Sequence, residues 1–98
     1  MLNNRALAYL ELDDNNNALN DLQAALTLVP QYPEALNNRG VVYQKLEKLD
    51  EAIADFTEAL KFDPKYLDAL ENRAFAYVEK NDHARGIADL EEIGRAHV

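Results

Sequence analysis

The sequence predicts an all-α fold, an α-solenoid made of antiparallel helix-turn-helix repeats. Three observations predict it. Residues recur at a spacing of 34, apolar residues within each unit follow a helical period, and short polar turns or proline separate successive helices. The chain has 98 residues, 48% of them hydrophobic and 29% charged, which is the composition of one globular domain.

Columns of identical residues define the repeat. Asn4, Asn38 and Asn72 are separated by 34 residues at each step. The agreement of several columns at one spacing excludes coincidence, so one unit is repeated about three times. The other columns are Arg5, Arg39 and Arg73; Tyr9, Tyr43 and Tyr77; and Asp21, Asp55 and Asp89.

The first helix of each unit follows from the spacing of its apolar and small residues. In the middle unit Leu36, Gly40 and Tyr43 step by four and three, which places them on one face of a helix. The same pattern recurs in the other units. We therefore expect first helices at about 1–12, 34–46 and 67–80.

The second helix of each unit has its own apolar face. In the middle unit this face carries Ile53, Phe56 and Leu60. Asp50 is placed to cap this helix, and Pro64 follows its end. We expect second helices at about 16–28, 50–62 and 84–93.

The turns within the units are short, so neighbouring helices should run antiparallel. Asp13, Glu47 and Asn81 stand at the turn between the first and second helix. Asp and Asn tolerate a left-handed backbone, which such turns use.

A unit of 34 residues with two helices, small residues at their crossing and a closing proline resembles the tetratricopeptide repeat family. The resemblance covers essentially the whole chain and implies a right-handed superhelix whose first helices line a concave groove. Arg39 departs from it, because the family usually has Leu there. With Pro33 as the first position, the matching residues of the middle unit are Leu36, Gly40, Tyr43, Ala52, Phe56, Ala59 and Pro64.

The resemblance divides the chain into repeats at 1–32, 33–66 and 67–91. The first begins inside its first helix and the third is incomplete, which predicts a fragment of a longer array that self-associates or is marginally stable alone. Residues 92–98, "EIGRAHV", resemble the translation of a sequencing-adapter oligonucleotide. We expect this tail to be non-native; a divergent last helix is the alternative.

Composition excludes several classes of function. The net charge of −8 argues against nucleic acid as a partner, because phosphate binding needs a basic surface. The chain has no Cys, no apolar run long enough for a membrane span and no signal-peptide pattern. We expect no membrane partner, and a cytoplasmic location is favoured.

The asparagine column is the main candidate for binding. In the family this position faces the groove, and an Asn amide offers one acceptor and two donors that match a peptide bond. We expect Asn4, Asn38 and Asn72 to hold the backbone of an extended peptide; loop capping and water binding are the alternatives. The neighbouring groove positions add Asn37, Leu7, Val41, Phe75, Gln44 and Glu71.

The arginine column has a structural interpretation. Arg replaces the usual Leu in every unit, and Asp stands in every second helix where an aromatic residue is frequent. This double change predicts ion pairs, within a unit or between neighbouring units, with the arginine stem covering apolar surface. Independently solvated charges are the alternative. The pairs are Arg5–Asp21, Arg39–Asp55 and Arg73–Asp89.

Part of the family binds the carboxylate at the end of chaperone tails through Lys, Asn and Arg. Only Asn38 matches that set. The other positions hold Asn3, Leu7, Asp68 and Asn72, and an acidic residue there repels a carboxylate. We expect no binding of heat-shock chaperone tails.

No catalytic constellation is visible. The chain has no Ser or Cys nucleophile, and His83 lies beside Asp82 without partners at metal-ligand spacing. With three Gly there is no phosphate-binding loop. We expect no catalytic residue, metal or cofactor.

The expected function is a protein-protein interaction scaffold that binds an extended peptide or protein segment, one with basic residues because of the acidic flanks. Two alternatives remain. One is a substrate-recruiting arm of a larger enzyme, and the other is an end-to-end self-assembly module.

Overall fold

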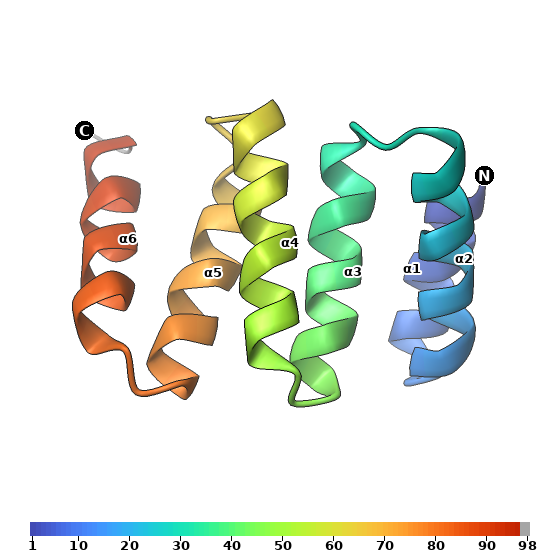
Figure 1. The fold of residues 1–98 in the computed structure, drawn as a ribbon, viewed down its shortest axis with the longest axis horizontal. Coiled ribbons are helices and arrows are strands. Elements are labelled where there is room, and N and C mark those ends of the chain that lie inside the picture. Colours follow the sequence, from blue (N-terminus) through green and yellow to red (C-terminus); the bar gives the residue numbers. More distant parts are fainter. Residues whose placement is uncertain (97–98) are drawn as a thin grey trace.

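The computed structural model describes residues 1–96, which form a row of six α-helices and no strand (Figure 1). The predicted all-α solenoid is therefore confirmed, with helix bounds close to those expected from the sequence. The helices are α1 (Leu2–Glu11), α2 (Asn15–Leu28), α3 (Pro33–Lys45), α4 (Leu49–Phe62), α5 (Leu67–Glu79) and α6 (His83–Ala96).

Each repeat is a helical hairpin: α1 pairs with α2, α3 with α4, and α5 with α6 (Figure 1). Packing of α3 on α2 and of α5 on α4 joins the hairpins. The first helices also contact each other, α1 with α3 and α3 with α5, whereas within residues 1–96 no contact joins α2 to α4 or α4 to α6. The first helices α1, α3 and α5 are thus more closely spaced, and we call them the inner layer.

The three turns within the hairpins share one backbone geometry. Asp13, Glu47 and Asn81 have φ values of 58°, 61° and 67°, in the left-handed region. The next N–H closes the turn on the carbonyl five residues earlier, which is a Schellman motif. Because these hydrogen bonds fix the turn, Glu47 adopts the same conformation as Asp and Asn. The closing bonds are Asp14 to Tyr9, Lys48 to Tyr43 and Asp82 to Tyr77, each 2.8 Å.

The expectation that Asp50 caps the second helix of the middle repeat is wrong. Helix α4 begins at Leu49, and Lys48 stands at its N-cap without a side-chain hydrogen bond. Asp50 lies in the first turn and forms an ion pair with Lys80 of the following repeat. The capping position is two residues earlier than assumed: in repeat 1 Asp14 stands there and accepts the N–H of Asn17 (3.3 Å).

Helix α6 continues through Gly94 to Ala96, beyond the expected end at residue 93. Gly94 has open space around it, since an added Cβ would meet nothing within 4 Å. Arg95 pairs with Glu92 along the same helix (3.3 Å). Residues 97 and 98 of the suspected tail lie outside the described residues.

Small residues let the two helices of a repeat approach closely. A Cβ added to Gly40 would lie 2.7 Å from Cδ1 and 2.9 Å from Cζ of Phe56, whose side chain is fully buried. The bulk of Phe56 therefore requires glycine opposite. The equivalent pairs in repeats 1 and 3 are Ala with Leu: Ala6 with Leu22, and Ala74 with Leu90.

Gly40→Ala should destabilise the protein by about 1–3 kcal/mol through overpacking against Phe56. This loss should exceed the gain of about 1 kcal/mol that Ala brings to a helix interior. Adding Phe56→Leu reproduces the Ala–Leu pair of the other repeats, so the double variant should lose less than the sum of the single losses. Urea unfolding measures all three variants; strictly additive losses would show that the two side chains do not compete for space.

Candidate functional site

The asparagines of the inner layer hydrogen-bond to one another across the repeats. Nδ2 of Asn38 donates to Oδ1 of Asn3 (2.8 Å), and Nδ2 of Asn72 donates to Oδ1 of Asn37 (3.0 Å). Asn3, Asn37 and Asn38 are buried, so these bonds are largely withdrawn from water, where a hydrogen bond is stronger. Each pair ties two successive first helices together.

These bonds take up part of the asparagine column. Asn38 and Asn72 each use one N–H, while Asn4 is exposed on α1. Within residues 1–96 the one fully buried side-chain polar atom without a partner is Oδ1 of Asn15. The remaining amide atoms of the column are therefore paired or reach solvent. The binding of a peptide backbone stays a prediction, and it now depends on those remaining atoms.

Sequence reasoning missed the pairing between the asparagines. The donor and acceptor are 35 residues apart, one more than the repeat, because they occupy adjacent positions of their helices. The signal was present in the sequence: Asn-Asn occurs at 3–4 and again at 37–38, and Asn72 continues the donor column. Glu71 interrupts the acceptor column.

A row of apolar side chains runs along the inner layer. Leu7, Val41 and Phe75 occupy one position of successive first helices. Leu7 is 41% exposed and Phe75 is 53% exposed, while Val41 is half-buried and packs against the core. Leu7 lies four residues after Asn3, so both share one helical face. Exposed apolar residues that recur along one surface mark an interaction site.

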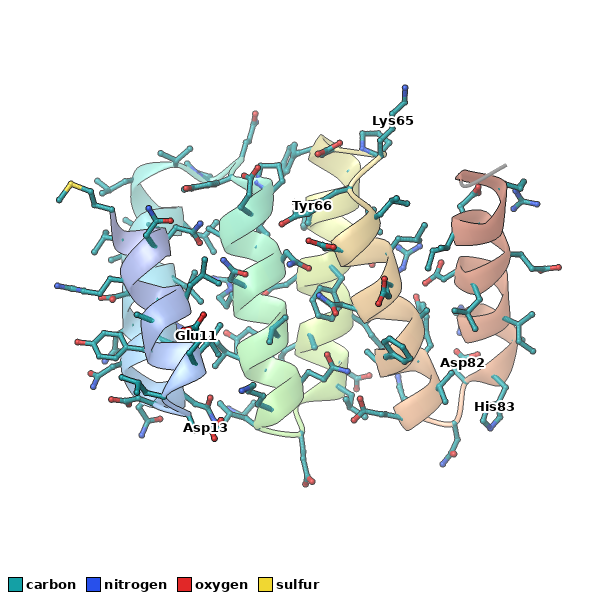
Figure 2. All side chains as sticks on the ribbon, turned by 180° about the vertical axis from the view of Figure 1, so that it is seen from behind. Glu11, Asp13, Lys65, Tyr66, Asp82 and His83 are labelled. Carbon is teal, nitrogen blue, oxygen red and sulfur yellow. The ribbon has the colours of Figure 1, made fainter. Side chains whose placement is uncertain are left out.

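Acidic groups flank this row. Glu11 lies on α1 near Asp13, and both are exposed in the view of Figure 2. Glu71 is exposed on α5. The basic Lys45 is engaged, since its Nζ contacts the Asp13 carboxylate at 3.1 Å. The inner layer therefore favours a basic partner.

The polar side chains at the far end of the inner layer also contact each other across repeats. Nε2 of Gln44 donates to Oε1 of Glu79 at 2.6 Å. Gln44, predicted as a groove residue, is thus bonded to the next first helix. The adjacent Val78 is exposed and extends the apolar row.

The three arginines form bidentate pairs with the aspartates of the same repeat. Each donates from Nε and Nη2 to the two carboxylate oxygens at 2.7–2.8 Å, the geometry in which Arg binds carboxylates most strongly. Of the two arrangements that the sequence left open, the structure has the pairs within repeats. Arg73 also donates to Thr57 of the preceding repeat (3.3 Å).

The pairs differ in exposure. The side chain of Arg5 is 61% exposed, whereas those of Arg39 and Arg73 are 24% and 20% exposed; the aspartates are buried in all three. Hydrogen bonds from Arg5 hold the pKa of Asp21 below its usual 3.8, although burial opposes this shift. The stability from this ionised carboxylate is present above about pH 3.8 and is lost as the pH falls through the lowered pKa.

Tyr66, before α5, was not singled out from the sequence (Figure 2). It is half-buried, and burial raises the pKa of its hydroxyl, helped by the charges of Asp68 and Glu34. A hydrogen bond with Asn37 acts in the opposite direction. Tyr66 thus joins the loop between repeats 2 and 3 to the asparagine pairs. Its repeat of Tyr32 at a spacing of 34 is the signal that would have found it.

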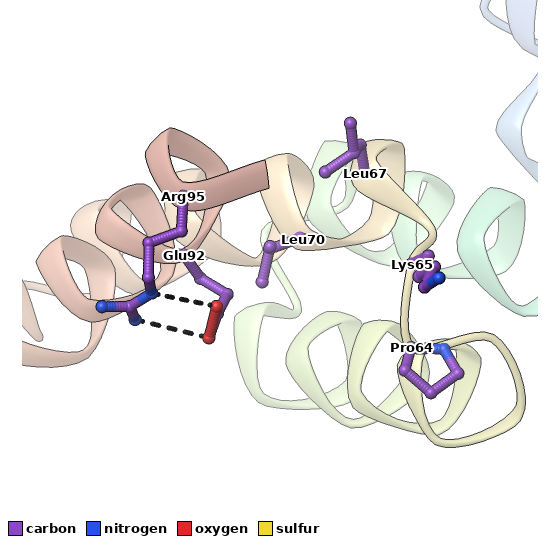
Figure 3. A pocket seen from close by; sticks show the side chains of 6 residues that line it. All are labelled: Pro64, Lys65, Leu67, Leu70, Glu92 and Arg95. Atoms are coloured by element: carbon purple, nitrogen blue, oxygen red, sulfur yellow. Dashed lines mark hydrogen bonds and ion pairs between the residues drawn. The ribbon is translucent and has the colours of Figure 1, made fainter. Parts of the chain in front are cut away.

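A pocket of about 540 Å³ opens between the start of α5 and the end of α6 (Figure 3). Two of its walls come from the segment expected to be non-native. It lies apart from the inner-layer row and gathers one ion pair over an apolar floor. Its lining residues are Pro64, Lys65, Leu67, Leu70, Glu92 and Arg95.

The described residues hold few features of a catalytic or membrane protein. His83 is exposed beside the Asp82 loop (Figure 2), and Asp82 pairs with Arg85 at 2.6 Å. Within residues 1–96 no three His, Cys, Asp or Glu side chains gather to hold a metal ion. None of the helices in this range has the length and apolar character required to cross a membrane.

Two family models match the sequence. One, described as tetratricopeptide repeat, matches residues 33–66, and the other, described as TPR repeat, matches residues 6–47. Together they include most of repeats 1 and 2. Among curated proteins, none matches the chain.

Several solved structures share this fold. The second and first TPR domains of Spaghetti (RPAP3), each bound to the HSP90 peptide SRMEEVD, are both 21% identical, with TM-scores of 0.88 and 0.89; both alignments cover 92% of this chain, and 83% and 71% of those chains. MamA (41-end) from Desulfovibrio magneticus RS-1 is 22% identical with a TM-score of 0.90, over 94% of this chain and 52% of that one. At these identities the likeness establishes the fold.

A double-mutant cycle with Arg39→Ala and Asp55→Ala should give a coupling of about 1–3 kcal/mol in unfolding free energy. Asp55→Ala alone should be the more harmful change, because it leaves a largely buried guanidinium without its partner. The same cycle on Arg5 and Asp21 is the matched control. Its coupling should be weaker, because solvent screens the exposed Arg5; equal couplings would contradict the role given to burial.

Proposed function

We propose, because this chain belongs to the tetratricopeptide repeat family, that it is a non-catalytic protein-interaction segment that binds an extended peptide along α1, α3 and α5. The row of Leu7, Val41 and Phe75 carries this proposal. Leu7 and Phe75 remain exposed although the rest of the inner layer is closely packed. The row offers apolar contacts at a regular step, which suits alternate side chains of an extended segment.

The charges on either side of the row select the partner. Glu11 and Glu71 are exposed, and the nearby Lys45 is paired with Asp13. A partner that carries Lys or Arg between its apolar residues complements this surface, and the net charge of −8 steers it toward the protein.

The asparagine column supplies the backbone contacts in this proposal. Asn38 and Asn72 each keep a carbonyl and one N–H outside their inter-repeat bonds, and Asn4 keeps its whole amide outside them. An amide fixed by a neighbouring repeat loses little freedom on binding, which favours affinity.

The solved relatives provide a contrast in ligand charge. Two of them hold the peptide SRMEEVD, which ends in acidic residues. The inner layer of this chain presents Asp68 and Glu71 instead of a basic set. We expect it to disfavour that peptide and to prefer basic segments.

Peptides that alternate apolar residues with Lys or Arg should bind the chain, and SRMEEVD should not. Phe75→Ser should weaken binding of the basic peptide about tenfold, because it removes an apolar contact. Leu28→Ser is the control, since Leu28 is an exposed apolar residue on α2. Isothermal titration calorimetry measures both variants; equal losses for Phe75 and Leu28, or tighter binding of SRMEEVD, would contradict the proposal.

Asn38→Ala separates the structural and binding roles of the asparagine column. It should lower unfolding free energy by about 1–3 kcal/mol, because the buried Asn3 loses its partner. Asn3→Ala removes the same hydrogen bond but leaves the Asn38 amide, so it is the matched control. If Asn38 contacts the ligand backbone, Asn38→Ala weakens peptide binding beyond Asn3→Ala. Equal affinities for the two variants would remove the ladder from the proposal.

A further inference from the structure

The outer face of α6 carries one half of the contact that joins repeats. Leu90 is 46% exposed, whereas its equivalents Leu22 and Phe56 are fully buried. Ile87, one turn earlier, is also exposed. In repeats 1 and 2, α3 and α5 pack on the second helix at this place. Helix α6 therefore has the surface that receives a first helix.

Helix α1 carries the other half. Ala8 is exposed, although its equivalents Val42 and Ala76 are fully buried. Leu12, one turn later, is 77% exposed. Its equivalent Lys80 reaches back to the preceding repeat and pairs with Asp50. Helix α1 thus has the surface with which α3 and α5 pack on the repeat before them.

We infer that this chain associates head to tail with a second copy of itself, α1 of one copy packing on α5 and α6 of the next in the register used between its own repeats. Both faces belong to the same molecule, so each copy offers a complete pair of complementary surfaces. The inference uses residues up to Leu90 and does not depend on the suspected tail.

The existing amide pairs fix which residues would meet. Asn3 accepts from Asn38 and Asn37 accepts from Asn72, each 35 residues later. One further step places Glu71 opposite Asn4 of the second copy. Glu71 is an exposed acceptor and Asn4 is an exposed amide with two donors, so their chemistry is complementary.

The same register brings apolar groups together at the other end of the helices. Lys80 contacts Asp50, thirty residues earlier, so Leu12 of the second copy falls opposite Ala84. Both are exposed in the single chain. Neither this contact nor the one between Glu71 and Asn4 places like charges side by side.

This contact is heterologous, because the two copies use different surfaces. Each added copy leaves one α1 face and one α6 face open, so growth does not stop at a dimer. The charge of −8 on every copy opposes association, and salt therefore favours it by screening that repulsion.

Sedimentation equilibrium from about 10 μM to about 1 mM tests the inference. The average mass should rise with concentration and pass the dimer mass without a plateau. Asn4→Asp places a carboxylate opposite Glu71 and should weaken association about tenfold or more. It should not unfold α1, because acidic groups are favourable in a first helical turn, and circular dichroism checks this.

Asn20→Asp is the matched control. It makes the same change of charge in a column, Asn20 with Ala54 and Ala88, that is exposed in every repeat, so association should not change. Glu71→Lys added to Asn4→Asp should restore association by pairing opposite charges. A monomer mass at all concentrations, a limit at the dimer, or equal effects of Asn4→Asp and Asn20→Asp would each overturn the inference. None of these outcomes bears on peptide binding, which is measured separately.

Discussion

The seam between successive repeats is the constraint on which the rest of the structure depends. A single hairpin cannot cover Leu22 or Phe56; the next repeat buries both completely. Such packing alone tolerates small slips of one helix along another. The amide bonds of Asn3 with Asn38 and of Asn37 with Asn72 remove this freedom, because a slipped register would leave buried amides unpaired. The polar pairs thus define where each first helix sits, and the apolar contacts supply most of the stability.

The arginine–aspartate pairs act within repeats and depend on the seam for their strength. All three have the same bidentate geometry, yet Arg5 is far more exposed than Arg39 or Arg73. The latter two also lie over tyrosine rings, 5.9 Å from the ring centroids of Tyr43 and Tyr77. An identical residue pair therefore has a different energy in each repeat, because a neighbouring repeat excludes water from some pairs and not from others.

The 34-residue period was sufficient to predict the fold, the six helices and the residues of the arginine–aspartate pairs. It identifies equivalent positions, and equivalent positions have equivalent local structure. It does not identify which positions of neighbouring repeats meet, which is why the Asn3–Asn38 bond was missed at its spacing of 35. The error at Asp50 has a local cause: repeat 2 carries Lys48 at the capping position, so the nearest acidic residue was taken for the cap. Contacts between repeats depend on helix rotation and packing distance, which periodicity alone leaves undetermined.

The same amides enter both the seam and the proposed binding surface, and the two roles support each other. An asparagine has more hydrogen-bonding atoms than one partner uses, so Asn38 can be fixed by Asn3 and still present a carbonyl and an N–H. A free asparagine would lose rotamer freedom on binding a peptide, whereas one already held by the next helix has lost it on folding. Such a column contributes orientation more than energy. In this model of binding, the apolar row of Leu7, Val41 and Phe75 supplies the affinity, and the surrounding acidic groups determine which sequences are accepted.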